Sequence, residues 1–157
     1  MSSNKKKYDE VDHDTMSICE PESYFGLEEF ELYKAARELR KRVYKVIKSL
    51  PNEEKYALGL QMRKAIISVT NNIADSHGRW HYQETISRLF RDRIARGSTE
   101  EIIDDLNICI DEGYSPTEIC ERLKKEGYKL VKQINSYIHY LKKSQKENTT
   151  KGRSADR

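Results

Sequence analysis

The sequence predicts an all-α protein, an up-down-up-down antiparallel four-helix bundle. Apolar residues recur every three or four positions over most of residues 27–141, which is the spacing of one buried face on an amphipathic helix. The few prolines and glycines fall mostly near the expected helix ends and indicate short connections. Because only 36% of the residues are hydrophobic and 35% are charged, the composition suits helices with one buried stripe, or a protomer that completes its core by oligomerising.

One folded domain is expected, because the chain has the length of a single domain. We place this domain, the bundle, at residues 23–143. Residues 1–22 are polar and aperiodic and are expected to form a disordered N-terminal arm. Residues 144–157 are polar and basic and are expected to form a disordered tail.

The first two helices are separated by a proline. The first is expected over residues 27–50, and Pro51 ends it because proline cannot continue the hydrogen-bond ladder. The second is expected over residues 52–76, with Asn52 as its N-cap and Gly78 as its stop.

The last two helices are marked by glycines and by a start signal. The third is expected over residues 82–112 and ends at Gly113. Gly97, near its middle, is expected to allow close approach of a neighbouring helix, since glycine in a helix interior otherwise costs about 1 kcal/mol. The fourth helix is expected to begin at the Ser-Pro-Thr-Glu run of residues 115–118, and Gly127 falls at a core position of it.

Polar residues gather near the end of the second helix. Asn71 and Asn72 stand beside an apolar position, so at least one is expected to hydrogen bond to another helix or chain. Asp75, His77 and His81 are a weak metal pattern, because a glycine interrupts the helix between the two histidines. We therefore predict no metal site and no cofactor.

The three cysteines are Cys19, Cys109 and Cys120, with no C-x-x-C pair. An odd number without a signal peptide favours reduced thiols in the cytoplasm. We interpret Cys109 and Cys120 as small apolar core residues. No apolar run approaches the ~20 residues of a membrane-spanning helix, so no membrane association is expected.

Positive charge is concentrated in one part of the chain. Residues 34–96 hold 15 Lys and Arg against six Asp and Glu, whereas residues 97–121 hold eight acids and no Lys or Arg. On the first helix, the bases at positions 34, 37, 41, 45 and 48 form a stripe opposite the apolar face, without acids that would pair with them four residues apart. This stripe has two readings: lysines that face water, or a contact surface for nucleic acid.

Phosphate binding by clustered bases is the first functional hypothesis. Trp80 is included as a side chain that could stack on a base, although packing of Trp80 at a subunit interface explains it equally well. The predicted nucleic-acid-binding residues are Lys34, Arg37, Lys41, Lys45, Arg63, Lys64, Arg79, Trp80, Arg88 and Arg91.

An enzymatic function is not expected. Asp104 and Asp105 are adjacent, so on a helix their carboxylates point about 100° apart and do not converge. The sequence shows no nucleophile paired with a base and no phosphate-binding loop.

Several short motifs occur in a recognisable order and spacing over about residues 24–141. They are Phe30-Glu31-Leu32-Tyr33-Lys34-Ala35, Leu50-Pro51, Glu54-Lys55-Tyr56-Ala57-Leu58, Gln61-Met62-Arg63-Lys64-Ala65, Ser68-Val69-Thr70-Asn71-Asn72-Ile73-Ala74-Asp75, Gly78-Arg79, Ala95-Arg96-Gly97-Ser98 and Gly113-Tyr114. In these motifs the chain resembles the four-helix bundle family encoded in 23S rRNA intervening sequences, sometimes labelled S23. The accessory variability proteins of diversity-generating retroelements are more distant relatives. Where the family usually has Asn-Ile-Ala-Glu-Gly, this chain has Asp75 and Ser76 in place of Glu and Gly.

The resemblance implies a homopentamer without established enzymatic activity and in association with nucleic acid. The first hypothesis is therefore a cytoplasmic RNA- or DNA-binding accessory protein of weak sequence preference, which uses a basic surface of its first three helices. The alternative is an oligomeric protein-interaction scaffold that docks a partner enzyme such as a reverse transcriptase.

Overall fold

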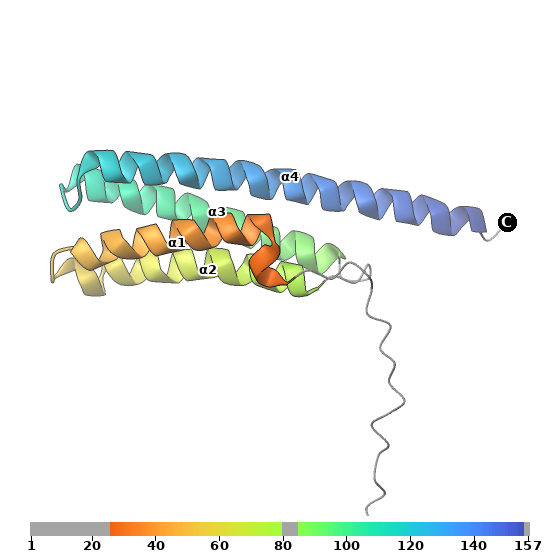
Figure 1. The fold of residues 1–157 in the computed structure, drawn as a ribbon, viewed down its shortest axis with the longest axis horizontal. Helices are drawn as coiled ribbons and strands as arrows, with labels where there is room; N and C mark the ends of the chain where they lie inside the picture. The colour runs from red at the N-terminus through yellow and green to blue at the C-terminus, as the bar shows by residue number, and fades with distance from the viewer. Residues whose placement is uncertain (1–25, 80–84, 156–157) are drawn as a thin grey trace, which may run out of the picture.

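A computed structural model describes residues 26–79 and 85–155, which form four long helices and two short 3-10 turns (Figure 1). In chain order they are η1 (Leu27–Glu29), α1 (Glu31–Ser49), η2 (Glu54–Tyr56), α2 (Leu58–Gly78), α3 (Thr85–Asp111) and α4 (Thr117–Ala155). The all-α prediction with four helices is confirmed. The arm predicted at residues 1–22 lies outside the described residues, as do Trp80 and His81.

The four helices are arranged around one core. Helix α1 packs against α2 and α4, and α3 packs against the same two helices. Successive helices run in opposite directions (Figure 1). The α1/α4 side of the bundle is therefore opposite the α2/α3 side.

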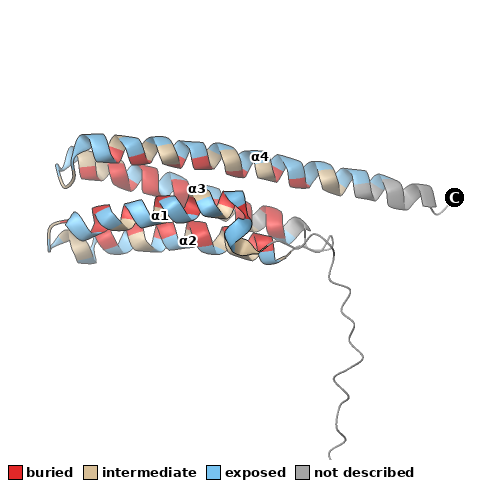
Figure 2. Cartoon of the chain, in the orientation of Figure 1, coloured by how far each residue is buried: buried red, intermediate tan, exposed pale blue. Residues whose placement is uncertain are grey.

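The core is built from the apolar stripe of each helix, and the buried positions face inward along the bundle (Figure 2). Cys109 and Cys120 are fully buried in it, as predicted. Burial raises the pKa of the Cys109 thiol to about 12, so this thiol stays protonated. On α1 the buried residues are Leu32, Ala36, Leu39, Val43, Val46 and Ile47.

The connection from α1 to α2 is longer than predicted. The carbonyl of Pro51 accepts hydrogen bonds from the backbone nitrogens of Glu54 and Lys55, at 3.0 and 3.1 Å, and these bonds close a separate turn before α2. Asn52 is not the N-cap of α2, because α2 begins only at Leu58; the Oδ1 of Asn52 instead accepts a hydrogen bond from Lys55 Nζ at 3.1 Å. Residue Ala57 takes the N-cap position.

Three glycines for which the sequence predicts a role have different surroundings in the structure. Gly113 follows α3 with a φ of +67°, a conformation that favours glycine, and its predicted role as a stop is confirmed. A Cβ on Gly127 would lie 2.9 Å from Cγ1 of Ile103, so α3 and α4 pack closely there, as predicted. The prediction for Gly97 is wrong, since a Cβ there would have no neighbour within 4 Å.

Helix α4 extends well beyond the other three (Figure 1). It continues to Ala155, so the disordered tail predicted from residue 144 is wrong over residues 144–155. These residues contain no proline and no glycine before Gly152, and helix-favouring Lys, Gln and Glu predominate between 142 and 147. Lys143 and Glu147 add an ion pair one turn apart, at 4.0 Å.

Candidate nucleic-acid interface

The stripe of bases on α1 is exposed as predicted, but it is not free of acids. Lys34 Nζ lies 2.7 Å from a carboxylate oxygen of Glu31. Lys41 Nζ lies 2.6 Å from Glu38, and this hydrogen bond lowers the pKa of the Glu38 carboxyl. Both acids stand three residues before their lysine, whereas the sequence prediction considered only acids four residues away. Exposed pairs of this kind contribute little stability and leave most of the lysine accessible.

A depression lies between α1 and α4, and we call it the α1/α4 groove. Its volume is about 600 Å³. The rim carries Arg42 and Lys45 from α1 and Arg122 from α4. The remaining lining residues are apolar or small: Val46, Ser49, Ser115, Pro116, Ile119 and Leu123.

A second depression of about 340 Å³ runs along α1, and we call it the α1 hollow. It is lined by four bases and one aromatic residue: Arg40, Lys41, Tyr44, Lys45 and Lys48. Arg40 is held in place by donating a 2.8 Å hydrogen bond to Thr70 Oγ1 of α2. Lys45 lines both depressions and so lies between them.

Apart from Arg40, which is bonded to Thr70, the bases that line the two depressions form one surface, which we call the basic α1/α4 surface: Lys41, Arg42, Lys45, Lys48 and Arg122. Two acids touch it, namely Glu38 at Lys41 and Glu126 at Arg42. Within the described part of the chain, Lys45, Lys48 and Arg122 form no ion pair. Three uncompensated cations around two depressions favour the binding of an anion such as phosphate.

The sequence prediction missed the contribution of α4. Residues 122–146 carry eight Lys and Arg against one acid, Glu126. A charge count over this segment would have revealed the bias. The meeting of Arg42 with Arg122, however, depends on tertiary packing, because 80 positions separate the two residues in the chain.

Lys64 and Arg63 do not join this surface. Lys64 lines a separate groove between α2 and α3, of about 560 Å³, together with Leu60 and Glu101. This groove lies on the opposite side of the bundle from the α1/α4 groove. Arg63 is half-buried and stands two turns before Thr70 on α2, which places it on the side of α2 that faces α1.

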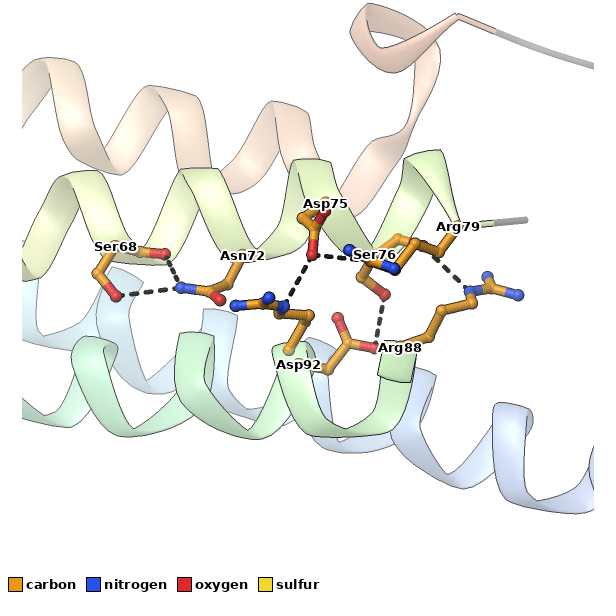
Figure 3. A network of polar contacts seen from close by, with 8 residues as sticks. Ser68, Asn72, Asp75, Ser76, Arg79, Arg88 and Asp92 are labelled. Atoms are coloured by element: carbon orange, nitrogen blue, oxygen red, sulfur yellow. Dashed lines mark hydrogen bonds and ion pairs between the residues drawn. The ribbon is translucent and has the colours of Figure 1, made fainter. Parts of the chain in front are cut away.

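Arg79 and Arg91 converge on one carboxylate, that of Asp75, which Figure 3 shows beside Arg79. Oδ2 of Asp75 lies 3.0 Å from Arg79 Nε and 2.8 Å from Arg91 Nε. The Asp75–Arg91 pair therefore links the end of α2 to α3, and part of the charge of both arginines is compensated. Within the described residues, no three His, Cys, Asp or Glu side chains gather as metal ligands would.

Arg88 is buried, so it is not part of an exposed nucleic-acid surface in this fold. Only 6% of the residue is exposed. Its Nε donates a 3.1 Å hydrogen bond to the carbonyl of Ser76, and its Nη2 donates to the hydroxyl of Tyr137. One guanidinium thus joins α2, α3 and α4, and its position inside the bundle corrects the prediction.

A buried carboxylate lies beside this arginine (Figure 3). Asp92 is 0% exposed, and its Oδ2 accepts a 3.0 Å hydrogen bond from Ser76 Oγ. Its other oxygen, Oδ1, has no hydrogen-bond partner within the described structure. Burial raises the pKa of the Asp92 carboxyl to about 7, against opposing effects of Ser76 and Arg88. Ser76 therefore supplies a hydrogen-bond partner for Asp92.

The asparagines do not connect helices within the protomer. Asn72 Nδ2 donates to the carbonyl and the hydroxyl of Ser68 in its own helix, at 2.8 and 3.2 Å (Figure 3). Asn71 is exposed. Near Asn72, a contact between α2 and α3 is made by the hydroxyls of Ser68 and Ser98, which lie 2.9 Å apart. The bonds of Asn72 thus stay within α2, and the predicted bond from an asparagine to another chain stays a prediction.

Comparison with known proteins bears on the family of the chain. Among residues 26–79 and 85–155, no helix combines the length and the apolar character needed to cross a bilayer. A search of curated proteins gives no significant match. A family model described as "23S rRNA-intervening sequence protein" matches residues 28–136, which extend from η1 to the first half of α4. The chain belongs to the family of 23S rRNA-intervening sequence proteins.

Proposed function

We propose that this protein is a non-enzymatic, cytoplasmic RNA-binding accessory protein that holds RNA on the basic α1/α4 surface. The observation that carries the proposal is the position of Lys45 between two depressions whose charged lining is basic. Membership in a family named for 23S rRNA intervening sequences favours RNA over DNA as the ligand.

The chemistry of the surface suits phosphate contacts. Lys41, Lys45 and Lys48 follow one another at about one helical turn, so their ammonium groups form a row along α1. Because lysine and arginine neutralise phosphates irrespective of the base, binding should depend strongly on salt and weakly on sequence. Tyr44, half-buried in the α1 hollow, offers a ring on which a base can stack.

The same lining supports binding without catalysis. The α1/α4 groove is lined by Arg, Lys, Ser, Pro and aliphatic side chains, and it includes no carboxylate or histidine that could act as a general base. The α1 hollow likewise contains bases and one tyrosine. Neither set of residues favours hydrolysis of the bound RNA.

Charge reversal tests the proposal. RNA binding by nuclease-treated protein is measured at about 50 and 200 mM salt, for the wild type and for the double variant K45E/R122E. The matched control is K64E/R93E, which changes the net charge equally at two exposed residues away from the surface.

We expect K45E/R122E to weaken binding at the lower salt by more than about tenfold, and K64E/R93E by less than about threefold. Equal losses of affinity for the two variants would mean that binding depends on the net charge of the protein and not on the basic α1/α4 surface. Unchanged binding by K45E/R122E would contradict the proposal.

A scaffold function is the second candidate, and the α2/α3 groove favours it. Leu60 is 46% exposed and Ile67 is 38% exposed on this side, beside the small residues Ala57, Ser68 and Ser98 of the groove. Such a surface could seat a helix of another subunit or of a partner enzyme such as a reverse transcriptase. If it does, L60D/I67D should lower the oligomer mass in solution and leave RNA affinity per protomer unchanged. An unchanged mass would exclude this groove as the subunit contact.

A further inference from the structure

An acidic segment precedes the basic first helix of the bundle in the chain. Residues 8–25, which precede the first described residue, contain six acids and no Lys or Arg. The acids are interspersed with apolar side chains, including Val11, Met16 and Ile18. This segment therefore combines negative charge with groups that can enter an apolar groove.

The α1/α4 groove has the complementary chemistry. Its floor is apolar, and Ile119 remains 37% exposed there. At its rim, Lys45 and Arg122 have no acidic partner within the described residues. An acidic and apolar peptide would cover the floor and neutralise both cations, whereas the third cation, Arg42, already has Glu126.

The segment is long enough to reach the groove from its own protomer. Lys45 lies about 21 Å along α1 from Glu31, at 1.5 Å per residue. The twelve residues that lead from Asp14 to Gly26 can extend to about 40 Å. The four acids at positions 9, 10, 12 and 14 can therefore reach the rim without strain on the helix.

We propose that residues 8–22 of the chain dock in the α1/α4 groove of the same protomer and compete with RNA for the basic α1/α4 surface. Carboxylates of the segment pair with Lys45 and Arg122, and its apolar side chains cover Val46, Ile119 and Leu123. The docking stands independently of RNA, whereas the competition rests on the proposed function.

Because the acidic segment is joined to the groove through the chain, even a weak contact between them can keep the segment docked. A segment joined to its site by a short linker has an effective concentration in the millimolar range. If the docked form accounts for about 90% of the molecules, the apparent RNA affinity is reduced about tenfold, because only the remaining fraction can bind. The segment then acts as an internal competitor whose strength falls as salt rises.

The docking is tested first without RNA. Methyl NMR signals of Val46, Ile119 and Leu123 are compared between the full-length wild type and the full-length variant D9N/E10Q/D12N/D14N. The matched control is E100Q/E101Q/D104N/D111N, which removes four exposed acids elsewhere. We expect the groove methyl signals to shift in the first variant and to remain in place in the control, at all protein concentrations. Absent shifts would overturn the proposal, and shifts that depend on concentration would assign the segment to another copy.

The competition is tested with RNA at about 50 mM salt. We expect D9N/E10Q/D12N/D14N to bind RNA about tenfold more tightly than the wild type, and the control by less than about threefold. Equal gains for the two variants would overturn the competition, because net charge alone would explain them. If the methyl signals shift but neither protein binds RNA, the docking stands and the proposed RNA function fails.

Discussion

Arg42 of α1 and Glu126 of α4 form an ion pair across the edge of the α1/α4 groove. The pair joins the two helices that carry the basic α1/α4 surface. In it, Glu126 neutralises the guanidinium of Arg42, which would otherwise be available to an RNA phosphate. Both side chains are partly exposed, so the pair contributes at most about 1 kcal/mol to stability. Its main effect is therefore on the charge of the surface.

The substitution E126Q should release Arg42 and strengthen RNA binding about twofold to fivefold at low salt, with little change in stability. Titration of a labelled RNA measures the affinity, and thermal unfolding measures the stability. E101Q is the matched control, because Glu101 is an exposed acid in the α2/α3 groove. Weaker binding by E126Q would show that the ion pair organises the site rather than masking it.

Two glycines should respond to the same substitution with opposite signs. G127A should lower the free energy of unfolding by about 1–2 kcal/mol, because its Cβ would overlap the buried Ile103. G97A should raise it by up to about 1 kcal/mol, because Gly97 has open space around it in a helix interior. Urea unfolding of both variants measures the difference, and a stabilising G127A would contradict the close packing of α3 against α4.

The buried carboxylate of Asp92 should make stability depend on pH. Since its folded-state pKa of about 7 is above the usual 3.8, the folded state binds more protons than the unfolded state between these values. This contribution therefore reduces stability as pH rises from about 4 to about 7. The amide in D92N removes the effect, so its stability relative to the wild type should increase by about 2–3 kcal/mol from pH 5 to pH 8.

Urea unfolding at pH 5, 6, 7 and 8 checks this expectation. The matched control is D104N, which removes an exposed carboxylate from the same helix. A constant difference between D92N and the wild type over this range would mean that Asp92 is ionised throughout.

Much of the fold could be predicted from the sequence, because the signal is local. Helical spacing identified the buried stripe of α1 from Leu32 to Ile47. The glycines show where this reasoning ends: Gly127 and Gly97 both lie inside helices, yet only Gly127 faces a neighbouring helix closely. Sequence position alone does not give the distance between two helices.

The candidate site was predictable only in part. Exposure of Lys41 and Lys45 follows from helical phase, since they stand opposite the apolar face. Arg88 carries the same charge but is buried, because Ser76 and Tyr137 supply partners from other helices. The approach of Arg122 to Arg42 and Lys45 likewise arises only when α4 packs against α1.

The central claim is that RNA phosphates contact the basic α1/α4 surface. The most direct measurement is the slope of the logarithm of RNA affinity against the logarithm of salt concentration, for the wild type, K45Q/K48Q and K64Q/R93Q. Because each lost contact to a single strand lowers the slope by about 0.7, we predict a reduction of about 1.4 for K45Q/K48Q and none for K64Q/R93Q. The same slope for the wild type and K45Q/K48Q would contradict the claim.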